Sequence, residues 1–151
     1  MTIQHFMEVL LVEDRKEDAE LTMRALKKNH LINEIKWIDD GQDALDYLFG
    51  NGNYLDKTYD LPKLILLDLK LPKVNGLEIL EKLKSHETLK QIPVVILTSS
   101  QEDVDIQKAY RMGVNSYIVK PIDFSKFAEA IKQVGIYWLM MNESPTKNSH
   151  A

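Results

Sequence analysis

Five short, mostly apolar stretches recur along the chain, and they limit its fold more than any other feature of the sequence. They span residues 7–12, 35–38, 64–68, 94–100 and 116–119. None shows the strict alternation of a strand with one face in water, so each predicts a strand that is buried on both faces. Segments with helical spacing of apolar residues separate these stretches. This order predicts an α/β fold with a doubly wound, five-stranded parallel sheet.

The connecting segments carry ordinary helix signals. Residues 17–28 place acids before lysines, an order that suits the helix dipole. The last helix is predicted from about Asp123 through Met141. Residues 50–61 form a long predicted loop, or a frayed helix end, before the third strand. We expect residues 1–141 to be one domain that includes this C-terminal helical extension, and residues 142–151 to be a flexible polar tail.

The bulk composition excludes several classes of protein. A chain of 151 residues fits one domain, and its net charge of −4 gives no support to nucleic-acid binding. Because the chain has no cysteine, it has neither a disulfide framework nor a thiolate metal site. The longest strictly apolar run, Ile136 to Met141, is far shorter than the roughly 20 residues of a membrane span. With no signal-peptide pattern, the sequence favours a soluble, cytoplasmic protein without a membrane partner.

Chemically useful side chains follow four of the predicted strands. Strand ends carry Glu13, Asp14, Asp68, Thr98 and Lys120. Because the carboxyl ends of parallel strands meet at one edge of a sheet, these side chains are expected to converge there. Three carboxylates in one hollow repel each other, and a hard divalent cation with oxygen ligands, Mg²⁺ or else Mn²⁺, relieves that repulsion. With the lysine ammonium, such a site can receive a small oxyanion, and a carboxylate in it can form an aspartyl phosphate.

Simpler interpretations exist for each residue taken singly. An acid pair suits the start of a helix, Thr98 can be a strand-end hydroxyl, and Lys120 can be a solvated lysine. Their joint position at strand ends favours a shared site instead. The sequence has no G-x-x-x-x-G-K-[ST] loop and no strand followed by G-x-G-x-x-G. It also lacks the D-x-D pair of haloacid-dehalogenase-like phosphatases, because Lys70 stands two residues after Asp68.

In order and spacing, these residues resemble the receiver domain of two-component response regulators, the CheY-like family. The resemblance covers roughly residues 7–134. It rests on an acid pair after strand one, Asp after strand three, Thr after strand four and Lys-Pro after strand five. The pattern D-x-x-[LM]-P-x-x-[ND]-G is matched by Asp68, Leu71, Pro72, Asn75 and Gly76. The resemblance implies a flavodoxin-like strand order, 2-1-3-4-5.

The resemblance also implies which residues accept the phosphoryl group and hold the metal ion. Asp68 is the expected phosphoacceptor, and a histidine kinase is the expected donor. Glu13 and Asp14 are expected to hold Mg²⁺, one directly and one through water. Asp68 and the backbone carbonyl of Lys70 complete the implied ligand set.

Three further residues are implied to respond to the phosphoryl group. Thr98 contacts it once it is in place, and Lys120 pairs first with Asp68 and then with the phosphate. Tyr117 stands where the family keeps an aromatic switch, which turns inward as Thr98 moves. A cis peptide is implied between Lys120 and Pro121, since bonds before proline adopt cis at low cost.

The C-terminal helix ends in residues that are apolar on nearly every side. They are Ile136, Tyr137, Trp138, Leu139, Met140 and Met141. Such a helix end either packs on its own domain or docks a partner. Together with the long loop at 50–61, this ending is similar to stand-alone regulators that are encoded with bacterial and cyanobacterial phytochrome kinases and are homodimeric. The resemblance thus implies a phytochrome kinase partner and a homodimer.

Two other functions stay open at this stage. One is an interaction module that works without phosphorylation, and the other is a phosphatase or another true enzyme. The first predicts a lost key residue, and none is lost, whereas the second lacks a second general acid. The sequence favours a phosphoacceptor signalling protein and not an enzyme. Lys70 and Ser100 stand two residues beyond Asp68 and Thr98, at positions that flank the path of hydrolytic water in the family, and they leave the lifetime of the phosphoryl group open.

Overall fold

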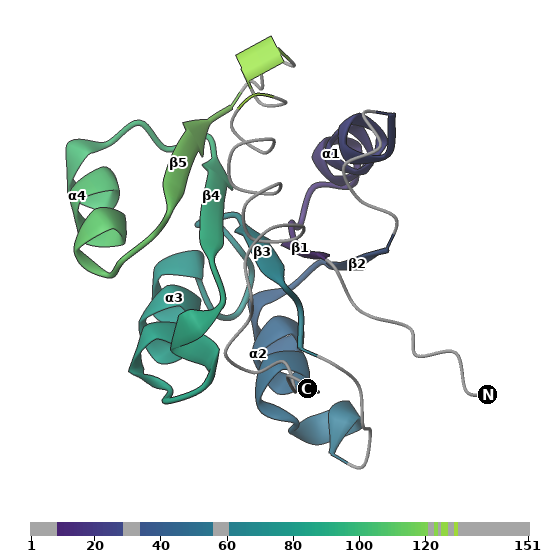
Figure 1. Cartoon of the computed structure of the whole chain (residues 1–151), viewed down its shortest axis with the longest axis vertical. Coiled ribbons are helices and arrows are strands. Elements are labelled where there is room, and N and C mark those ends of the chain that lie inside the picture. The colour runs from purple at the N-terminus through teal and green to yellow at the C-terminus, as the bar shows by residue number, and fades with distance from the viewer. Residues whose placement is uncertain are drawn as a thin grey trace, which may run out of the picture.

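A parallel sheet forms the centre of the molecule. The structure is a computed structural model that describes residues 9–28, 34–55 and 61–120, together with 123, 125, 126 and 129. Five strands lie side by side in the order β2-β1-β3-β4-β5 (Figure 1). They are β1 (Val9–Val12), β2 (Ile35–Ile38), β3 (Leu64–Leu67), β4 (Val94–Thr98) and β5 (Ser116–Val119). Each lies within the stretch predicted for it, so the predicted fold class and strand order are confirmed.

Helices connect the strands. The described α-helices are α1 (Lys16–Lys28), α2 (Gly41–Phe49), α3 (Gly76–Ser85) and α4 (Asp103–Arg111), and η1 (Gly52–Tyr54) and η2 (Leu89–Gln91) are short 3₁₀ helices. The segment 50–61, which was predicted as a loop or a frayed helix end, contains η1. Ser125, Lys126 and Glu129 are helical, as predicted, and Asp123 Oδ1 accepts hydrogen bonds from the backbone amides of Ser125 and Lys126. The other residues of the predicted last helix, the apolar end at 136–141 among them, lie outside the described residues, as does Pro121.

The two faces of the sheet pack against different helices. Val9 and Leu11 join the side chains of α1 in one apolar cluster, whereas Leu10 and Val12 join those of α2, α3 and α4 in another. Successive strand residues therefore alternate between two dry faces, which explains why β1 and β3 are apolar throughout. Within the described part of the chain, no helix has the length and apolar character of a membrane span.

The loop between β3 and α3 is held against its neighbours by close backbone contacts. The Gly76 amide donates a hydrogen bond of 2.7 Å to the carbonyl of Leu69. A Cβ atom at Gly76 would lie only 2.2 Å from the carbonyl oxygen of Asp68, and one at Gly41 would lie 1.9 Å from that of Val74. Only glycine fits at either position unless the loop moves. The segment that begins at Asp68 is therefore fixed between α2 and α3.

Candidate functional site: an acidic pocket

Three carboxylates meet where β1 and β3 end. Glu13 and Asp14 follow β1, and Asp68 follows β3. Each offers an oxygen that lies within 4.8 Å of an oxygen of the others. Glu13 and Asp68 are buried, with 2% and 5% of their surface exposed, while Asp14 is exposed. Two buried carboxylates are costly unless a cation or hydrogen-bond donors compensate them.

Lys120 supplies the compensating charge from the end of β5. Its Nζ lies 3.0 Å from Asp68 Oδ2 and 3.1 Å from Asp18 Oδ2, and it also donates a hydrogen bond to Glu13 Oε1. The Lys120 side chain is only 9% exposed. Sequence reasoning missed Asp18, because an acid in the first turn of a helix is what the helix dipole favours anyway. One ammonium group is thus shared by three carboxylates from two strands and α1.

The charges in this pocket depend on each other. Burial raises the pKa of Glu13 to about 8; its hydrogen bond to Lys120 acts the other way, and the neighbouring Asp68 adds to the rise. Burial also opposes the charge on Lys120, but the hydrogen bond to Glu13 and the charge of Asp68 outweigh this and raise the pKa of Lys120. The ammonium therefore stays charged at neutral pH, and Glu13 retains a proton. A divalent cation at this site would displace that proton.

The donor set fits a divalent metal ion. Carboxylate oxygens are the hard ligands that such ions take, and the three that converge here come from adjacent strands. The backbone around them is positioned by hydrogen bonds. The Lys70 amide donates to Asp68 Oδ1 at 3.1 Å, and the indole Nε1 of Trp37 donates to the backbone carbonyl of Glu13 at 2.7 Å. Trp37 was not predicted, since its strand position alone gives no sign of this contact.

Thr98 and Tyr117 lie on the other side of the pocket, on β4 and β5. Thr98 is fully buried, and its Oγ1 accepts a long hydrogen bond of 3.4 Å from the amide of Ser100. The Tyr117 hydroxyl donates to the carbonyl of Ser100 at 2.9 Å, so it points into the loop that follows β4. Burial raises the pKa of Tyr117, which keeps its hydroxyl a donor at neutral pH. Ser100 therefore links Thr98 and Tyr117, two of the three residues that were expected to respond to a phosphoryl group.

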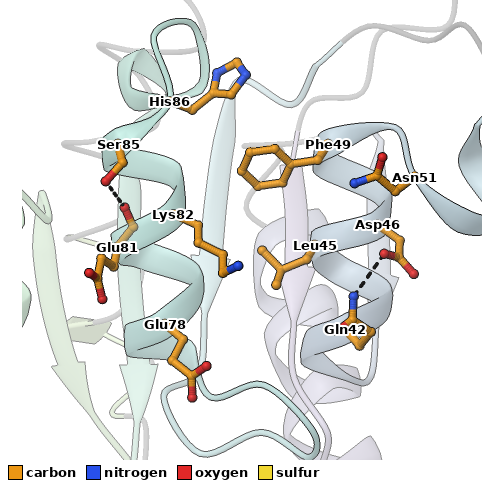
Figure 2. A pocket seen from close by; sticks show the side chains of 10 residues that line it. All are labelled: Gln42, Leu45, Asp46, Phe49, Asn51, Glu78, Glu81, Lys82, Ser85 and His86. Carbon is orange, nitrogen blue, oxygen red and sulfur yellow. Dashed lines mark hydrogen bonds between the residues drawn. The ribbon is translucent and has the colours of Figure 1, made fainter.

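Two of the hollows among the described residues differ in what lines them. One, of about 500 Å³, borders the acidic pocket and is lined by Asp14, Lys70 and Asp105 together with apolar residues of the loop after β3. Lys70 is exposed, and its ammonium forms no salt bridge within the described part of the chain. The other, of about 550 Å³, lies between α2 and α3 over Leu45 and Phe49 (Figure 2). It contains none of the residues predicted for the site.

Fold and pocket together define a class of protein. A doubly wound sheet with three carboxylates and a lysine at its carboxyl edge is a phosphoacceptor domain of the receiver type. The sequence profile of the family described as "Response regulator receiver domain" matches residues 9–132. The chain belongs to this family, whose members are phosphoacceptor signalling proteins and not classical enzymes.

Two curated relatives illustrate the range of the family. The chain is 44% identical over 140 residues to the probable methanogenesis regulatory protein FilR2 of Methanothrix harundinacea, which covers 91% of this chain and 86% of the relative. It is 37% identical over 131 residues to the response regulator Rcp1 of Synechocystis sp., which covers 87% and 88% of the two chains. Both alignments span most of this chain and most of the relative.

Solved structures of phytochrome response regulators are also similar. The bacteriophytochrome response regulator RtBRR is 50% identical, covers 94% of this chain and 86% of its own, and has a TM-score of 0.78. The phosphorylated cyanobacterial phytochrome response regulator RcpA is 38% identical, covers 94% and 100%, and has a TM-score of 0.78. The Mn²⁺-bound form of Rcp1 is 35% identical, covers 93% and 99%, and has a TM-score of 0.77. The resemblance to stand-alone regulators of this kind is confirmed.

Proposed function

We propose that Asp68 accepts a phosphoryl group from a histidine kinase and that the charge so acquired is the signal. The observation that carries the proposal is the convergence of Glu13, Asp14 and Asp68 within 4.8 Å, with the Lys120 ammonium 3.0 Å from Asp68. A nucleophilic carboxylate needs cations beside it to hold the dianionic phosphoryl group that it acquires. Lys120 provides one such charge, and the three carboxylates can hold the second as a metal ion.

The proposed step is a phosphoryl transfer from a phosphohistidine. An oxygen of Asp68 attacks phosphorus, and the bond between phosphorus and the imidazole nitrogen breaks. The electron pair of that bond stays on the nitrogen, which then takes a proton. Lys120 faces the reacting carboxylate, and Thr98 is proposed to donate a hydrogen bond to the transferred group.

We propose Mg²⁺ as the ion of this site, with Mn²⁺ as a substitute. Glu13, Asp14, Asp68 and the backbone carbonyl of Lys70 would hold it. When bound, the ion neutralises charge on the phosphoryl oxygens. The donor set and the Mn²⁺-bound form of Rcp1 support a divalent ion of this kind. Isothermal titration with Mg²⁺ should give one site per chain, and Asp14→Asn should weaken it without unfolding the protein.

The test of the phosphoacceptor is incubation with acetyl phosphate and Mg²⁺, followed by intact mass. The wild-type chain should gain one phosphoryl group, and Asp68→Asn should gain none. Asp39→Asn is a matched control, because Asp39 is an exposed aspartate that follows β2, another strand of the same sheet. Uptake by Asp68→Asn would overturn the proposal. A wild-type chain that takes up no phosphoryl group would favour an interaction module that works without phosphorylation.

We further propose that the donor kinase is a bacterial phytochrome. The 50% identity to RtBRR over most of both chains supports this pairing. The similarity to FilR2, which is described as a regulator of methanogenesis, makes a direct test necessary. Radiolabelled phytochrome kinase should transfer phosphate to the wild-type chain within minutes and not to Asp68→Asn. Equal transfer from an unrelated histidine kinase would contradict a dedicated phytochrome partner.

The proposal takes the chain as a cytoplasmic homodimer of one receiver domain at residues 1–141 with a polar tail at 142–151. Its basis is the apolar end of the predicted last helix, above all Trp138 and Met141, which lies outside the described residues. Light scattering of the full chain should give the mass of a dimer. Replacing Trp138 and Met141 by serine should give the monomer mass while phosphoryl uptake persists. An unchanged dimer in that variant would place the interface elsewhere.

A further inference from the structure

Ser100 has an unusual number of hydrogen bonds for a loop residue. It is 4% exposed and lies between β4 and α4. Its Oγ donates to Asp105 Oδ2 at 2.6 Å and accepts a longer bond of 3.4 Å from the amide of Glu102. Its amide donates to Thr98 Oγ1, and its carbonyl accepts from the Tyr117 hydroxyl. Ser100 thus connects the end of β4, the Tyr117 side chain on β5 and the start of α4.

The bond between Ser100 and Asp105 fixes the start of α4. Glu102 is the N-cap of this helix, but its side chain accepts no capping hydrogen bond. The link from Asp105, in the first turn, back to Ser100 holds the loop and the helix together instead. Asp103 lies in the same turn with the same charge, but it is exposed, and its side chain forms no hydrogen bond or salt bridge with any described residue. Only one of the two acids therefore ties α4 to the loop.

This arrangement affects the hydroxyl group of Thr98. An oxygen that accepts a hydrogen bond from a backbone amide keeps its own proton free to donate. The Ser100 amide occupies a lone pair of Thr98 Oγ1, so the Thr98 proton is available to another acceptor, such as a phosphoryl oxygen. The position of the Ser100 amide depends in turn on the side-chain bond to Asp105. Asp105 also lines the hollow that borders Asp14 and Lys70, which places this link at the edge of the pocket.

We propose that Ser100 and Asp105 form a latch that positions the loop between β4 and α4, so that the Thr98 hydroxyl is oriented to donate to the phosphoryl group on Asp68. Both are positioning residues that act through Thr98. This inference rests on the proposed phosphoacceptor function. It adds a side-chain pair that sets how readily the group is accepted and kept.

The test compares rates of phosphoryl uptake from acetyl phosphate with Mg²⁺ for the full chain and its variants. Ser100→Ala and Asp105→Ala should each slow uptake roughly three- to ten-fold, the effect of one net hydrogen bond. Asp103→Ala is the matched control and should stay within about two-fold, since it loses the same charge near the helix start but no bond to Ser100. Ser100→Thr keeps the hydroxyl and should restore uptake.

A double-mutant cycle separates positioning from simple stability. If Ser100 acts through Thr98, Ser100→Ala should have little further effect on uptake in a Thr98→Ala background, while its effect on urea unfolding should persist. Equal rates for Asp105→Ala and Asp103→Ala, or a full effect of Ser100→Ala without Thr98, would overturn the latch. Failure of the wild-type chain to take up phosphate would overturn the proposed function itself, which is a different result.

Discussion

The two sides of the acidic pocket are held in place by different kinds of contact. On one side, β1 and β3 are fully buried, and backbone contacts at Gly76 fix the loop that begins at Asp68. On the other side, β5 is only partly buried, and side-chain hydrogen bonds of Tyr117 and Lys120 connect it to the pocket. The backbone contacts at Gly76 leave no room for another arrangement of the loop, whereas a side chain can rotate and form a hydrogen bond with a different group. The proposed acceptor thus lies on the rigid side, and Tyr117 and Lys120, two of the groups expected to respond to it, lie on the adjustable side.

The largest effect is expected on the rigid side. Gly76→Ala places a Cβ atom 2.2 Å from the carbonyl oxygen of Asp68, so the loop after β3 must move. We expect the free energy of unfolding to fall by about 3 kcal/mol, as for severe overpacking. Gly50→Ala is the control, because Gly50 has a left-handed φ of 69° but no atom within 4 Å, and it should lose only about 1 kcal/mol. Urea denaturation measures both, and equal losses would show that the loop is less fixed than described.

A loss of similar size is expected when the shared ammonium on the adjustable side is removed. Lys120→Met leaves the buried Asp68 carboxylate without its cation and Glu13 without its hydrogen-bond donor, which should cost about 3 kcal/mol in the absence of metal. Mg²⁺ should restore more stability to this variant than to the wild type. Lys16→Met removes an exposed lysine that lies 4.0 Å from Glu20, and it should change stability by no more than about 0.5 kcal/mol. Thermal unfolding of both variants and the wild type, with and without Mg²⁺, measures these differences in stability.

Glu13 should make the stability of the metal-free protein depend on pH. Its pKa is about 8 in the folded protein and 4.5 as a free group, so between these values the folded state binds one more proton than the unfolded state. Stability should therefore fall as pH rises from about 5 to 8, by at most about 1.4 kcal/mol per pH unit. Lys120 adds nothing in this window, because its pKa is raised further above the ordinary value of a lysine.

Glu13→Gln isolates this contribution. The difference in unfolding free energy between wild type and variant should carry the slope, and it should flatten above about pH 8. Mg²⁺ affinity of the wild type should rise over the same range, since the ion displaces the proton. A difference that stays constant from pH 5 to 8 would mean that Glu13 is already ionised in the folded protein.

The smallest effect is expected from a single hydroxyl group. Tyr117→Phe removes the hydrogen bond to the Ser100 carbonyl and should cost about 1 kcal/mol. Tyr110→Phe is the control, because the side chain of Tyr110 is 52% exposed, and it should be nearly neutral. Chemical denaturation measures both variants. If the two behave alike, the Tyr117 bond contributes nothing to holding β5 to the loop.

The sequence predicted those site residues whose chemically useful side chain comes directly after an apolar strand. The apolar stretch before Asp68 identified a central strand, and parallel topology then brought Glu13, Asp14 and Asp68 together. It could not find Asp18, whose place on α1 has an ordinary explanation. Contacts made by tertiary packing also gave no signal in the sequence. Trp37 and the bond between Ser100 and Asp105 are of this kind, since each depends on where two elements meet.

The hydrogen bond from Trp37 to the carbonyl of Glu13 gives the molecule an intrinsic fluorescent reporter. The indole donates a hydrogen bond to the backbone of a proposed metal-binding residue, so its emission should respond when the charge in the pocket changes. The chain has two tryptophans, and Trp138→Phe leaves Trp37 as the sole source of tryptophan emission. Metal arrival and phosphoryl uptake can then be followed in real time in the full chain, without an attached dye.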